Sequence, residues 1–345
     1  MQRVVRCTSS LKELRGTLVV AGASHAMLVP FVVLTVVLQA AGTSAAEAQQ
    51  AKSPQSLAAE RLQSGRAAEA RDAFESVLNA DPANKDAQDG EVAASEQLAL
   101  DARRNSHMED ALSFLVRAQQ FVPKNAHLLY DLGIQEDDMQ LYQDADRTLA
   151  LAEQLNPGDP NVMYAVARVK LDLGQLSQAE EKMQEYLKAR PNDASAHYGL
   201  GRVYQQGLQF DQARAEFQRS IELQPVQTEA YYQLGDIALG QGDFAEALSD
   251  FGKTLVRDPK HGGALAGTGQ AYFKQKQYVQ AEEFLERAVA AAPEYETGHY
   301  YLGLTLARLG RKEDSERELA LATKLADAAS KKARSSLHLN PAATN

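Results

Sequence analysis

Cysteine is nearly absent from this sequence, since Cys7 is the one thiol among 345 residues. It precedes the apolar run Ala26 to Leu38, whereas a lipid-modified export cysteine would follow such a run. Beyond this N-terminal segment the chain has no thiol, so we expect neither a disulfide nor a cysteine metal site. Tryptophan is missing altogether, but 44% of the residues are hydrophobic and 24% are charged, a balance typical of a protein that forms a core.

Motifs of catalysis and cofactor binding are missing as well. There is no His-Glu-x-x-His pair for zinc and no Gly-x-x-x-x-Gly-Lys loop for phosphate. The short "GTG" from Gly267 to Gly269 has no strand before it, so it does not predict a dinucleotide turn. The sequence therefore predicts no enzyme activity, no cofactor and no metal.

Residues 1–45 have the composition of an export segment. Four basic residues come first, then the apolar run, then the small residues of "AAGTSAAEA" with a cleavage site near Ala46. This order is typical of a signal peptide, although such signals usually run ~15 to 30 residues. Leu18 to Ala41 is also long enough to span a bilayer as an uncleaved anchor. Both alternatives place the remaining chain outside the cytoplasm, most plainly in a bacterial periplasm, because basic residues stay on the cytoplasmic side.

The rest of the chain is acidic. The whole sequence has a net charge of −10, and leaving out the four basic residues and one acidic residue of residues 1–45 makes it −13. Such a surface repels phosphate backbones and anionic headgroups. We expect no nucleic-acid partner and no membrane contact other than through the N-terminal segment.

A 34-residue period runs through most of the chain and is marked by proline, alanine and glycine. The prolines are Pro123, Pro157, Pro191, Pro225, Pro259 and Pro293. The alanines are Ala111, Ala145, Ala179, Ala213, Ala247 and Ala281. The glycines are Gly133, Gly201, Gly235, Gly269 and Gly303, with Ala167 in the one slot that lacks glycine. Three series with one period indicate an internal repeat.

Within each period the apolar residues predict two helices. Between residues 228 and 261, one apolar stripe runs from Tyr231 to Ala238 and a second from Phe244 to Leu255, separated by "GQGD". No segment alternates in the manner of a strand, so we expect helix, turn and helix throughout. The glycines expected to end first helices in the left-handed conformation are Gly174, Gly242 and Gly310.

The order of these residues resembles the tetratricopeptide repeat. Leu234-Gly235, then Ala247, then a large residue four positions on, then Pro259, follows the family pattern and recurs from unit to unit. The resemblance covers about residues 51–327. It implies an all-α fold, a right-handed superhelical solenoid of antiparallel helix pairs whose first helices line a concave groove.

We expect three parts: a signal or anchor at 1–45, a solenoid at 46–329, and a helix end with a disordered tail at 330–345. The solenoid has about eight units, at 51–84, 85–125, 126–159, 160–193, 194–227, 228–261, 262–295 and 296–329. The second unit is seven residues too long, which is close to two helical turns. Its surplus is either a longer first helix around Ala93 to Asn105 or a protruding loop at "RRNSHMED". In the last unit Ser315 and Asp327 replace the alanine and the proline, and its polar second helix is interpreted as a cap.

The glycine inside each first helix needs a reason, because it costs about 1 kcal/mol relative to alanine. By the resemblance, Gly235 lies where two helices approach closely, and Ala247 serves the same contact. We therefore expect Gly235→Leu to damage folding. Tyr232→Ala, by contrast, is expected to damage binding alone.

Other reactive side chains are interpreted as structural. His197 and His299 occupy positions where other units have large apolar residues, so we expect them to pack between helices. Glu136, Asp137 and Asp138 are acidic neighbours that point in different directions on a helix. We interpret them as a solvated helix end.

A tyrosine series gives the strongest functional signal. By the resemblance, the fifth residue of each unit lies on the concave side of the first helix, where it either contacts a partner or packs on the next unit. The series consists of Tyr130, Tyr164, Tyr198, Tyr232 and Tyr300, with Ala266 in the remaining slot. Around it, the further candidate contact residues are Arg168, Arg202, Gln205, Asp236 and Gln270.

Aromatic rings and arginines are favoured where a protein partner docks. We therefore expect a non-catalytic scaffold of the cell envelope that binds a peptide or a partner helix in the groove. The family's clamp for chaperone tails needs lysine and asparagine at these positions, and this chain has tyrosine with arginine or aspartate. The alternative is a glycan ligand, peptidoglycan or exported polysaccharide, which would require several coplanar exposed rings. The resemblance also implies envelope roles such as assembly of pili, outer-membrane proteins or polysaccharide export.

Overall fold

The computed structural model describes residues 53–338, and every regular element in that part of the chain is an α-helix. The signal or anchor at 1–45 and the last seven residues lie outside the described residues. Among the helices that are described, none has both the length and the apolar character that crossing a membrane requires.

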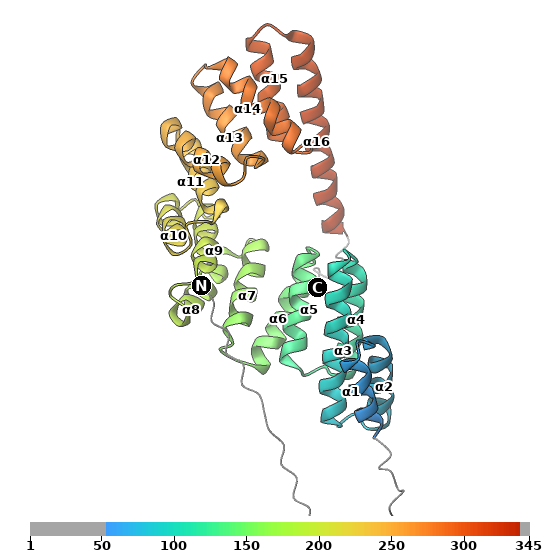
Figure 1. Ribbon diagram of the computed structural model, residues 1–345. Helices are drawn as coiled ribbons and strands as arrows, with labels where there is room; N and C mark the ends of the chain where they lie inside the picture. Colours follow the sequence, from blue (N-terminus) through green and yellow to red (C-terminus); the bar gives the residue numbers. More distant parts are fainter. Residues whose placement is uncertain (1–52, 339–345) are drawn as a thin grey trace, which may run out of the picture. The chain divides into compact units, whose positions relative to one another are not determined.

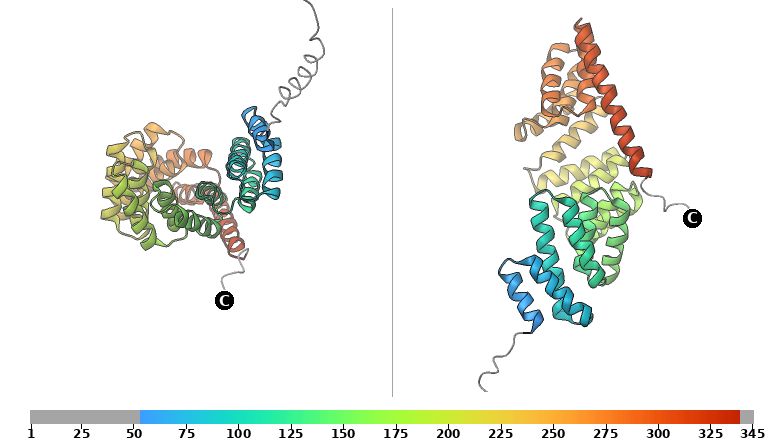
Figure 2. Two further views of the ribbon diagram at one scale, coloured as in Figure 1. Left: turned by 90° about the horizontal axis from the view of Figure 1, so that it is seen from below. Right: turned by 90° about the vertical axis from the view of Figure 1, so that its right-hand side faces the viewer.

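The helices follow one another as antiparallel pairs joined by short turns (Figure 1). Their bounds are α1 Pro54–Gln63, α2 Ala67–Ala80, α3 Lys85–Arg104, α4 Met108–Phe121, α5 Ala126–Asp138, α6 Tyr142–Leu155, α7 Pro160–Asp172, α8 Leu176–Ala189, α9 Ala194–Gln206, α10 Phe210–Leu223, α11 Thr228–Gln241, α12 Phe244–Arg257, α13 Gly262–Lys274, α14 Tyr278–Ala291, α15 Glu296–Arg308 and α16 Lys312–His338. Odd-numbered helices are the first helices of the units and even-numbered helices the second. Two further views show the same succession of pairs (Figure 2).

The surplus of the second unit is helical. α3 has 20 residues, whereas the first helices α5, α7 and α9 have 13 each. The helix ends at Arg104 and α4 begins at Met108, so "RRNSHMED" contains only the usual turn and the loop alternative is wrong. An insertion of seven residues keeps the buried face of the helix in register because it is close to two turns.

A residue in the left-handed conformation follows the first helix of every unit. The expected glycines do this, with φ of 71° at Gly174, 83° at Gly242 and 82° at Gly310. The equivalent residues of the other units are Gly65, Ser106, Gln140, Leu208 and Lys276, with φ between 59° and 78°. The turn therefore has the same geometry whether or not a glycine is present, and the four non-glycine residues are strained.

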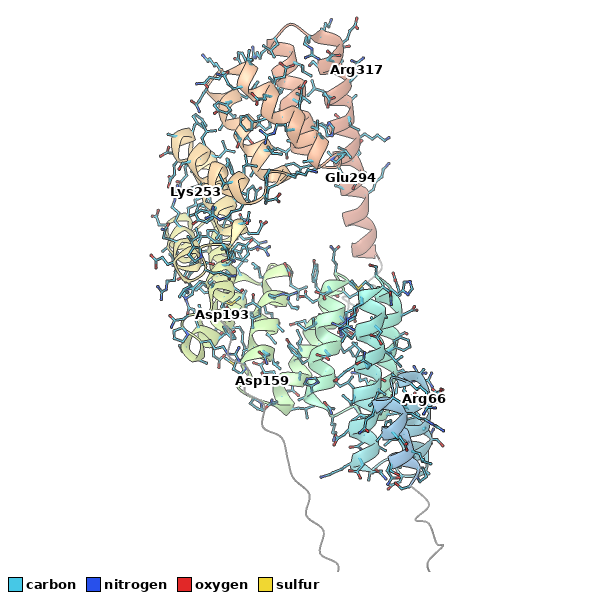
Figure 3. All side chains as sticks on the ribbon, viewed as in Figure 1. Arg66, Asp159, Asp193, Lys253, Glu294 and Arg317 are labelled. Atoms are coloured by element: carbon cyan, nitrogen blue, oxygen red, sulfur yellow. The ribbon has the colours of Figure 1, made fainter. Side chains whose placement is uncertain are left out.

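Several first helices begin at a side chain that caps the backbone. Asp159 accepts a hydrogen bond from the backbone N–H of Asn161, and Asp193 accepts from those of Ser195 and Ala196. Figure 3 labels both aspartates on the ribbon. Asn84 and Asn125 cap α3 and α5 in the same way. These caps satisfy donors that a helix start leaves open.

Each glycine of the 34-residue series lies against a large side chain 16 residues later, on the second helix of the same unit. The partners are Leu149 for Gly133, Phe217 for Gly201, Phe251 for Gly235, Leu285 for Gly269 and Leu319 for Gly303. The close approach of two helices is thus confirmed. A second glycine, Gly267 of the next unit, lies against Cζ and Cε2 of the same ring, so Phe251 also joins neighbouring units.

The last helix is longer than the cap that the sequence predicts. α16 has 27 residues and ends at His338, so residues 334–338, expected to be part of a disordered tail, are helical. Basic residues in "KKAR" favour the C-terminal end of a helix, and lysine, arginine and alanine are good helix formers. Ser315 and Ala322 of this helix are buried, whereas the polar residues between them are largely exposed, as the end of a stack requires.

Candidate functional site

Successive first helices pack against one another along the stack. The pairs α5–α7, α7–α9, α11–α13 and α13–α15 are all in contact, while successive second helices are farther apart. First helices therefore lie on the inner side of the stack. We call the surface that carries Tyr130, Tyr164, Tyr198, Tyr232 and Tyr300 on these helices the tyrosine face.

The three central tyrosines pack on the second helix of their own unit. The ring centroid of Tyr164 lies 5.3 Å from that of Tyr186, and the centroid of Tyr198 lies 5.6 Å from that of Phe217. The Tyr232 ring lies 5.9 Å from Phe251. All three pairs are tilted and each tyrosine is half-buried, so one ring surface supports the fold and the remainder faces outward.

Tyr232 is the most enclosed of the series. Its ring lies 4.8 Å from the ring of His261, and its hydroxyl oxygen would be 3.0 Å from a Cβ at Gly263. Burial raises its pKa above the usual range, and Tyr295 beside it acts in the same direction. Burial raises the pKa of Tyr164 and Tyr198 as well. These phenols stay protonated at neutral pH; the Tyr232 hydroxyl already hydrogen-bonds Tyr295, which leaves those of Tyr164 and Tyr198 as donors to a ligand.

The outer members of the series differ from the central three. Tyr300 is 42% exposed, with its ring edge-on to Tyr301 at 5.3 Å. Tyr130 is half-buried and lines a small cavity of about 150 Å³ together with His127 and Asp159. The tyrosine face therefore consists of an open end at Tyr300 and more enclosed rings along α5 to α11.

Arg168 is not a free cation, because it forms an ion pair with Asp137 of α5 and lies 3.6 Å from a carboxylate oxygen of Asp138. Asp137 is 4% exposed and Glu136 is 8% exposed, so the interpretation of this segment as a solvated helix end is wrong for both. The reason is packing from two sides, since Asp137 faces α7 of the next unit while Thr148 of α6 hydrogen-bonds Glu136. Only Asp138 is exposed.

Burial changes the ionisation of this acidic segment. It raises the pKa of Glu136 from 4.5 to about 7, although the hydrogen bond with Thr148 opposes the change. Burial also raises the pKa of Asp137, and the charge of Arg168 opposes it. Burial by itself lowers the pKa of Arg168, but Asp137 and Asp138 more than compensate and raise it.

Arg202 is the accessible cation of the tyrosine face. It is exposed and has no hydrogen bond or ion pair with any residue of the described part of the chain. Its charge acts on the phenols of Tyr142, Tyr164 and Tyr198 and lowers the pKa of each in part. One cationic fork therefore lies among three tyrosines and is available to a partner.

Three further candidates meet at one cavity. Gln205 Nε2 donates to Asp236 Oδ2 at 3.3 Å, which links α9 to α11, and Gln270 of α13 lies on the same cavity wall. The cavity has a volume of about 300 Å³, and Phe210 and Leu239 supply apolar walls. Burial raises the pKa of Asp236, although its carboxylate is exposed to solvent at the surface. A side chain that is reachable yet surrounded by protein atoms is typical of a concave surface.

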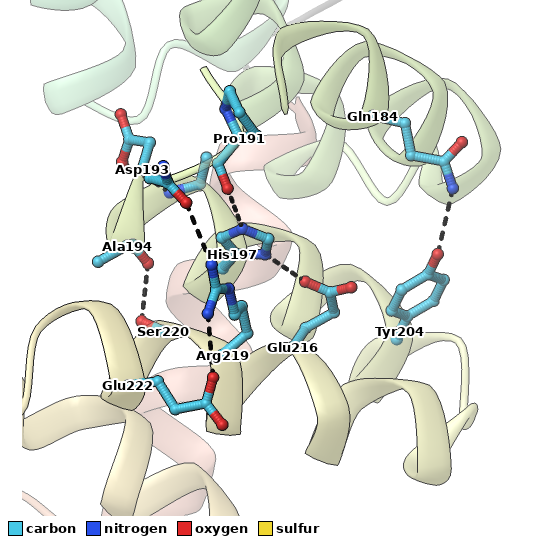
Figure 4. Close-up of polar contacts among 12 residues, drawn as sticks. Gln184, Pro191, Asp193, Ala194, His197, Tyr204, Glu216, Arg219, Ser220 and Glu222 are labelled. Carbon is cyan, nitrogen blue, oxygen red and sulfur yellow. Dashed lines mark hydrogen bonds and ion pairs between the residues drawn. The ribbon is translucent and has the colours of Figure 1, made fainter. Parts of the chain in front are cut away.

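The histidines have structural roles, as the sequence predicts. His197 Nδ1 lies 2.6 Å from Glu216 and its Nε2 lies 3.1 Å from the carbonyl oxygen of Pro191, contacts drawn in Figure 4. His299 repeats this arrangement with Glu318 and the carbonyl oxygen of Pro293. Both imidazoles thus connect the two helices of one unit and its preceding turn.

One histidine belongs to a different kind of cluster. His127 Nδ1 lies 2.7 Å from Glu96 Oε1, and with Asp131 these residues bring three potential ligand atoms within 4.8 Å of one another. The charge of Arg103 acts on both carboxylates and opposes a bound cation there. The three side chains form an ion-pair cluster between α3 and α5.

Sequence reasoning missed several residues of the tyrosine face. Asp137 is interpreted from the sequence as a solvated acid. It is instead buried and forms an ion pair with Arg168, so Arg168 is not available to a partner. Phe210 and Leu239 line the cavity but were not among the candidates, and Tyr295 reaches Tyr232 from the turn before α15. Two signals were available: the apolar character of Leu239 near the end of a first helix, and the 34-residue spacing of Phe210 with Leu176, Phe244 and Tyr278. No sequence pattern indicated that Tyr295 would contact Tyr232.

A comparison with family models matches residues 164–228, 204–256, 232–296 and 269–333 to the tetratricopeptide repeat. The four matches overlap and together extend from α7 into α16. A comparison with curated proteins finds no match.

Several solved structures share the fold. A tetratricopeptide repeat protein from Parabacteroides merdae is 18% identical, with 72% of this chain and 96% of that chain covered and a TM-score of 0.55. The hetero-tetramer Cut9–Hcn1 is 18% identical over 75% of this chain and 50% of that chain, with a TM-score of 0.56. PilF of Pseudomonas aeruginosa is 15% identical, with 56% of this chain and 88% of that chain covered and a TM-score of 0.51. At these identities the likeness concerns the arrangement of helices.

Proposed function

Because the chain belongs to the tetratricopeptide repeat family, we propose that it is a non-catalytic scaffold that binds an extended peptide or a partner helix on the tyrosine face. The observation that carries the proposal is Arg202, an exposed guanidinium without a partner among the described residues, placed beside the phenols of Tyr164 and Tyr198. Tyrosine and arginine are the residues that concentrate binding energy at protein interfaces.

The ring geometry favours a protein partner over a glycan. A glycan-binding face needs exposed rings, whereas Tyr164, Tyr198 and Tyr232 are half-buried against aromatic rings of their own second helices. The hydroxyl groups of Tyr164 and Tyr198 are potential donors to peptide carbonyl groups. A peptide can place its backbone along this row and its side chains between the rings.

We place this scaffold in the cell envelope, on the outer side of the bacterial inner membrane. The support is the order of charge, apolar run and small residues in residues 1–45. N-terminal sequencing of the protein recovered from envelope fractions tests this proposal. A start near Ala46 indicates a cleaved signal, an intact N-terminus in the membrane fraction indicates an anchor, and recovery from the cytoplasm contradicts both.

Substitution of the free cation tests the binding face. Arg202→Glu reverses a charge that forms no ion pair with a described residue. The fold should therefore be retained while binding of the partner is lost. Arg287→Glu, an exposed arginine on the second helix α14, makes the same change off the tyrosine face. Partners crosslinked in envelope extract are compared between the two variants by mass spectrometry.

The proposal predicts that at least one abundant partner protein disappears with Arg202→Glu and remains with Arg287→Glu. Retention of every partner by a folded Arg202→Glu variant contradicts it. Sedimentation with purified peptidoglycan or exported polysaccharide, carried out with the same two variants, tests the glycan alternative. Saturable binding that Arg202→Glu abolishes would favour a glycan ligand.

A further inference from the structure

The cavity between α9, α11 and α13 combines one carboxylate with apolar walls. Asp236 lies in it together with the carboxamides of Gln205 and Gln270, and Phe210 and Leu239 form part of the walls. Its volume of about 300 Å³ exceeds that of the cavity beside Tyr130, about 150 Å³. A polar group therefore lies beside an apolar passage that is wide enough for a side chain.

No cationic side chain among residues 53–338 forms an ion pair with the carboxylate in this cavity. Burial is the one influence that shifts the pKa of Asp236, and no positive group contributes. Arg214 donates to Oε1 of Gln241, a residue of the cavity wall, at 2.7 Å and pairs with Glu246 at 2.7 Å, so this cation is already engaged. Asp236 is reachable from solvent, so a cationic ligand that enters the cavity meets an unpaired carboxylate.

The oxygens around the cavity match the donors of an ammonium group. Gln205 uses its Nε2 to donate to Asp236, which leaves its own carbonyl oxygen as an acceptor. Gln270 has no hydrogen-bond partner among residues 53–338. Asp236, Gln205 and Gln270 thus offer three separate acceptors, and a lysine ammonium has three donors with no acceptor.

We propose that this cavity receives a lysine side chain of the peptide bound on the tyrosine face, with the ammonium at Asp236 and the methylene stem against Phe210 and Leu239. A long side chain of this kind covers apolar surface with its stem while its head stays polar. The inference rests on the proposed peptide-binding function and adds the identity of one anchor. The acidic chain, with its net charge of −10, also attracts a basic partner.

A positional peptide library tests the inference. Labelled nonapeptides with one fixed residue and random residues elsewhere are mixed with the purified full-length chain, and binding is measured by fluorescence anisotropy. The tightest sequence is then resynthesised with lysine, with norleucine and with acetyl-lysine at the selected position. The three peptides are measured against the wild type, Asp236→Asn, Gly240→Leu and the control Asp327→Asn, which alters an exposed aspartate of α16.

The variants separate binding from folding. Asp236→Asn keeps the shape of the side chain, and Gly240 lies in open space, so its replacement by leucine fills the cavity mouth without a clash. We expect lysine to be selected at one position, and Asp236→Asn or norleucine each to weaken binding about tenfold. Combining the two should cause little further loss, because both remove the same ion pair. Gly240→Leu should weaken binding similarly, and Asp327→Asn should leave it unchanged.

The contrary outcomes distinguish this inference from the proposed function. Peptides that bind the wild type with no preference for lysine, or equally well to Asp236→Asn, overturn the lysine pocket and leave the peptide-binding face in place. Selection of arginine over lysine also overturns it, since the three acceptors were matched to an ammonium. If the protein binds no peptide of the library, both proposals are contradicted.

Discussion

Gly235 lies directly against the ring of Phe251, so that a Cβ added to the glycine would be 2.7 Å from Cδ1 and from Cε1 of that ring. Phe251 is fully buried. A Cβ at Gly267 would be 2.5 Å from Cζ of the same ring. One phenylalanine therefore contacts two glycines of successive first helices, and the absence of two side chains sets how closely the units stack.

This contact predicts that Gly235→Leu is strongly destabilising. A leucine must displace the buried ring, and overpacking of this kind costs about 1–3 kcal/mol. Gly240→Leu on the same helix is the matched control, because its Cβ meets open space and leucine favours helix by about 1 kcal/mol over glycine. Urea unfolding followed by circular dichroism compares the two. Equal midpoints would show that the Phe251 contact does not limit the volume at position 235.

The packing of Tyr232 changes what its removal should do. The sequence predicts that Tyr232→Ala affects binding alone, but the ring contacts Phe251 and His261 and lies against Gly263 of the next unit. We expect Tyr232→Ala to lower the free energy of unfolding by about 2 kcal/mol, less than for a fully buried ring. Tyr232→Phe keeps the packing and serves as the control. An unfolding midpoint unchanged by Tyr232→Ala would restore the original prediction.

The strained turn at Leu208 predicts a stabilising substitution. Leu208 has φ of 59° and a side chain that is 73% exposed, so it incurs the left-handed penalty without burying much surface. Leu208→Gly should raise the free energy of unfolding by about 1 kcal/mol. Gln218→Gly, in the exposed middle of α10, should lower it by about 1 kcal/mol. Thermal unfolding compares the two variants. If both have a lower unfolding temperature than the wild type, the argument from backbone strain is refuted.

A buried glutamate in the second unit predicts a pH dependence of stability. Glu91 is fully buried and accepts a hydrogen bond from Ser95 at 3.1 Å. Burial raises its pKa from 4.5 to about 7, with the Ser95 hydrogen bond opposing the change. Because the folded state binds this proton more tightly than the unfolded state, the stabilisation is fully present below pH 4.5 and is lost as the pH rises through 7.

The rise in the pKa of Glu91 on folding corresponds to about 3 kcal/mol of unfolding free energy, lost between pH 4.5 and 7. Glu91→Gln cannot ionise, so its stability should fall less between pH 4.5 and 7, with a slope smaller by up to about 1.4 kcal/mol per pH unit. Chemical unfolding at several pH values measures the slope, and Glu283→Gln, an exposed glutamate of α14, is the control. A Glu91→Gln slope identical to that of the wild type would mean that Glu91 stays ionised in the folded protein.

The sequence alone determined the elements of this fold because they depend on local periodicity. The 34-residue series of glycine, alanine and proline predicted helix pairs, left-handed glycines such as Gly242 and the close approach at Gly235, and all three are confirmed. These features repeat at a fixed spacing, and each is caused by residues within one unit. Recognition of the family follows from the same local pattern.

The tertiary structure alone decided which side chains of different units meet. The burial of Asp137 and its pairing with Arg168, and the meeting of Gln205, Asp236 and Gln270 at one cavity, depend on the angle between neighbouring units. The choice between helix and loop in the second unit was settled by the packing of α3 between α2 and α4. Such contacts join residues about 30 positions apart, and their geometry results from the packing of all the intervening side chains, which no single motif describes.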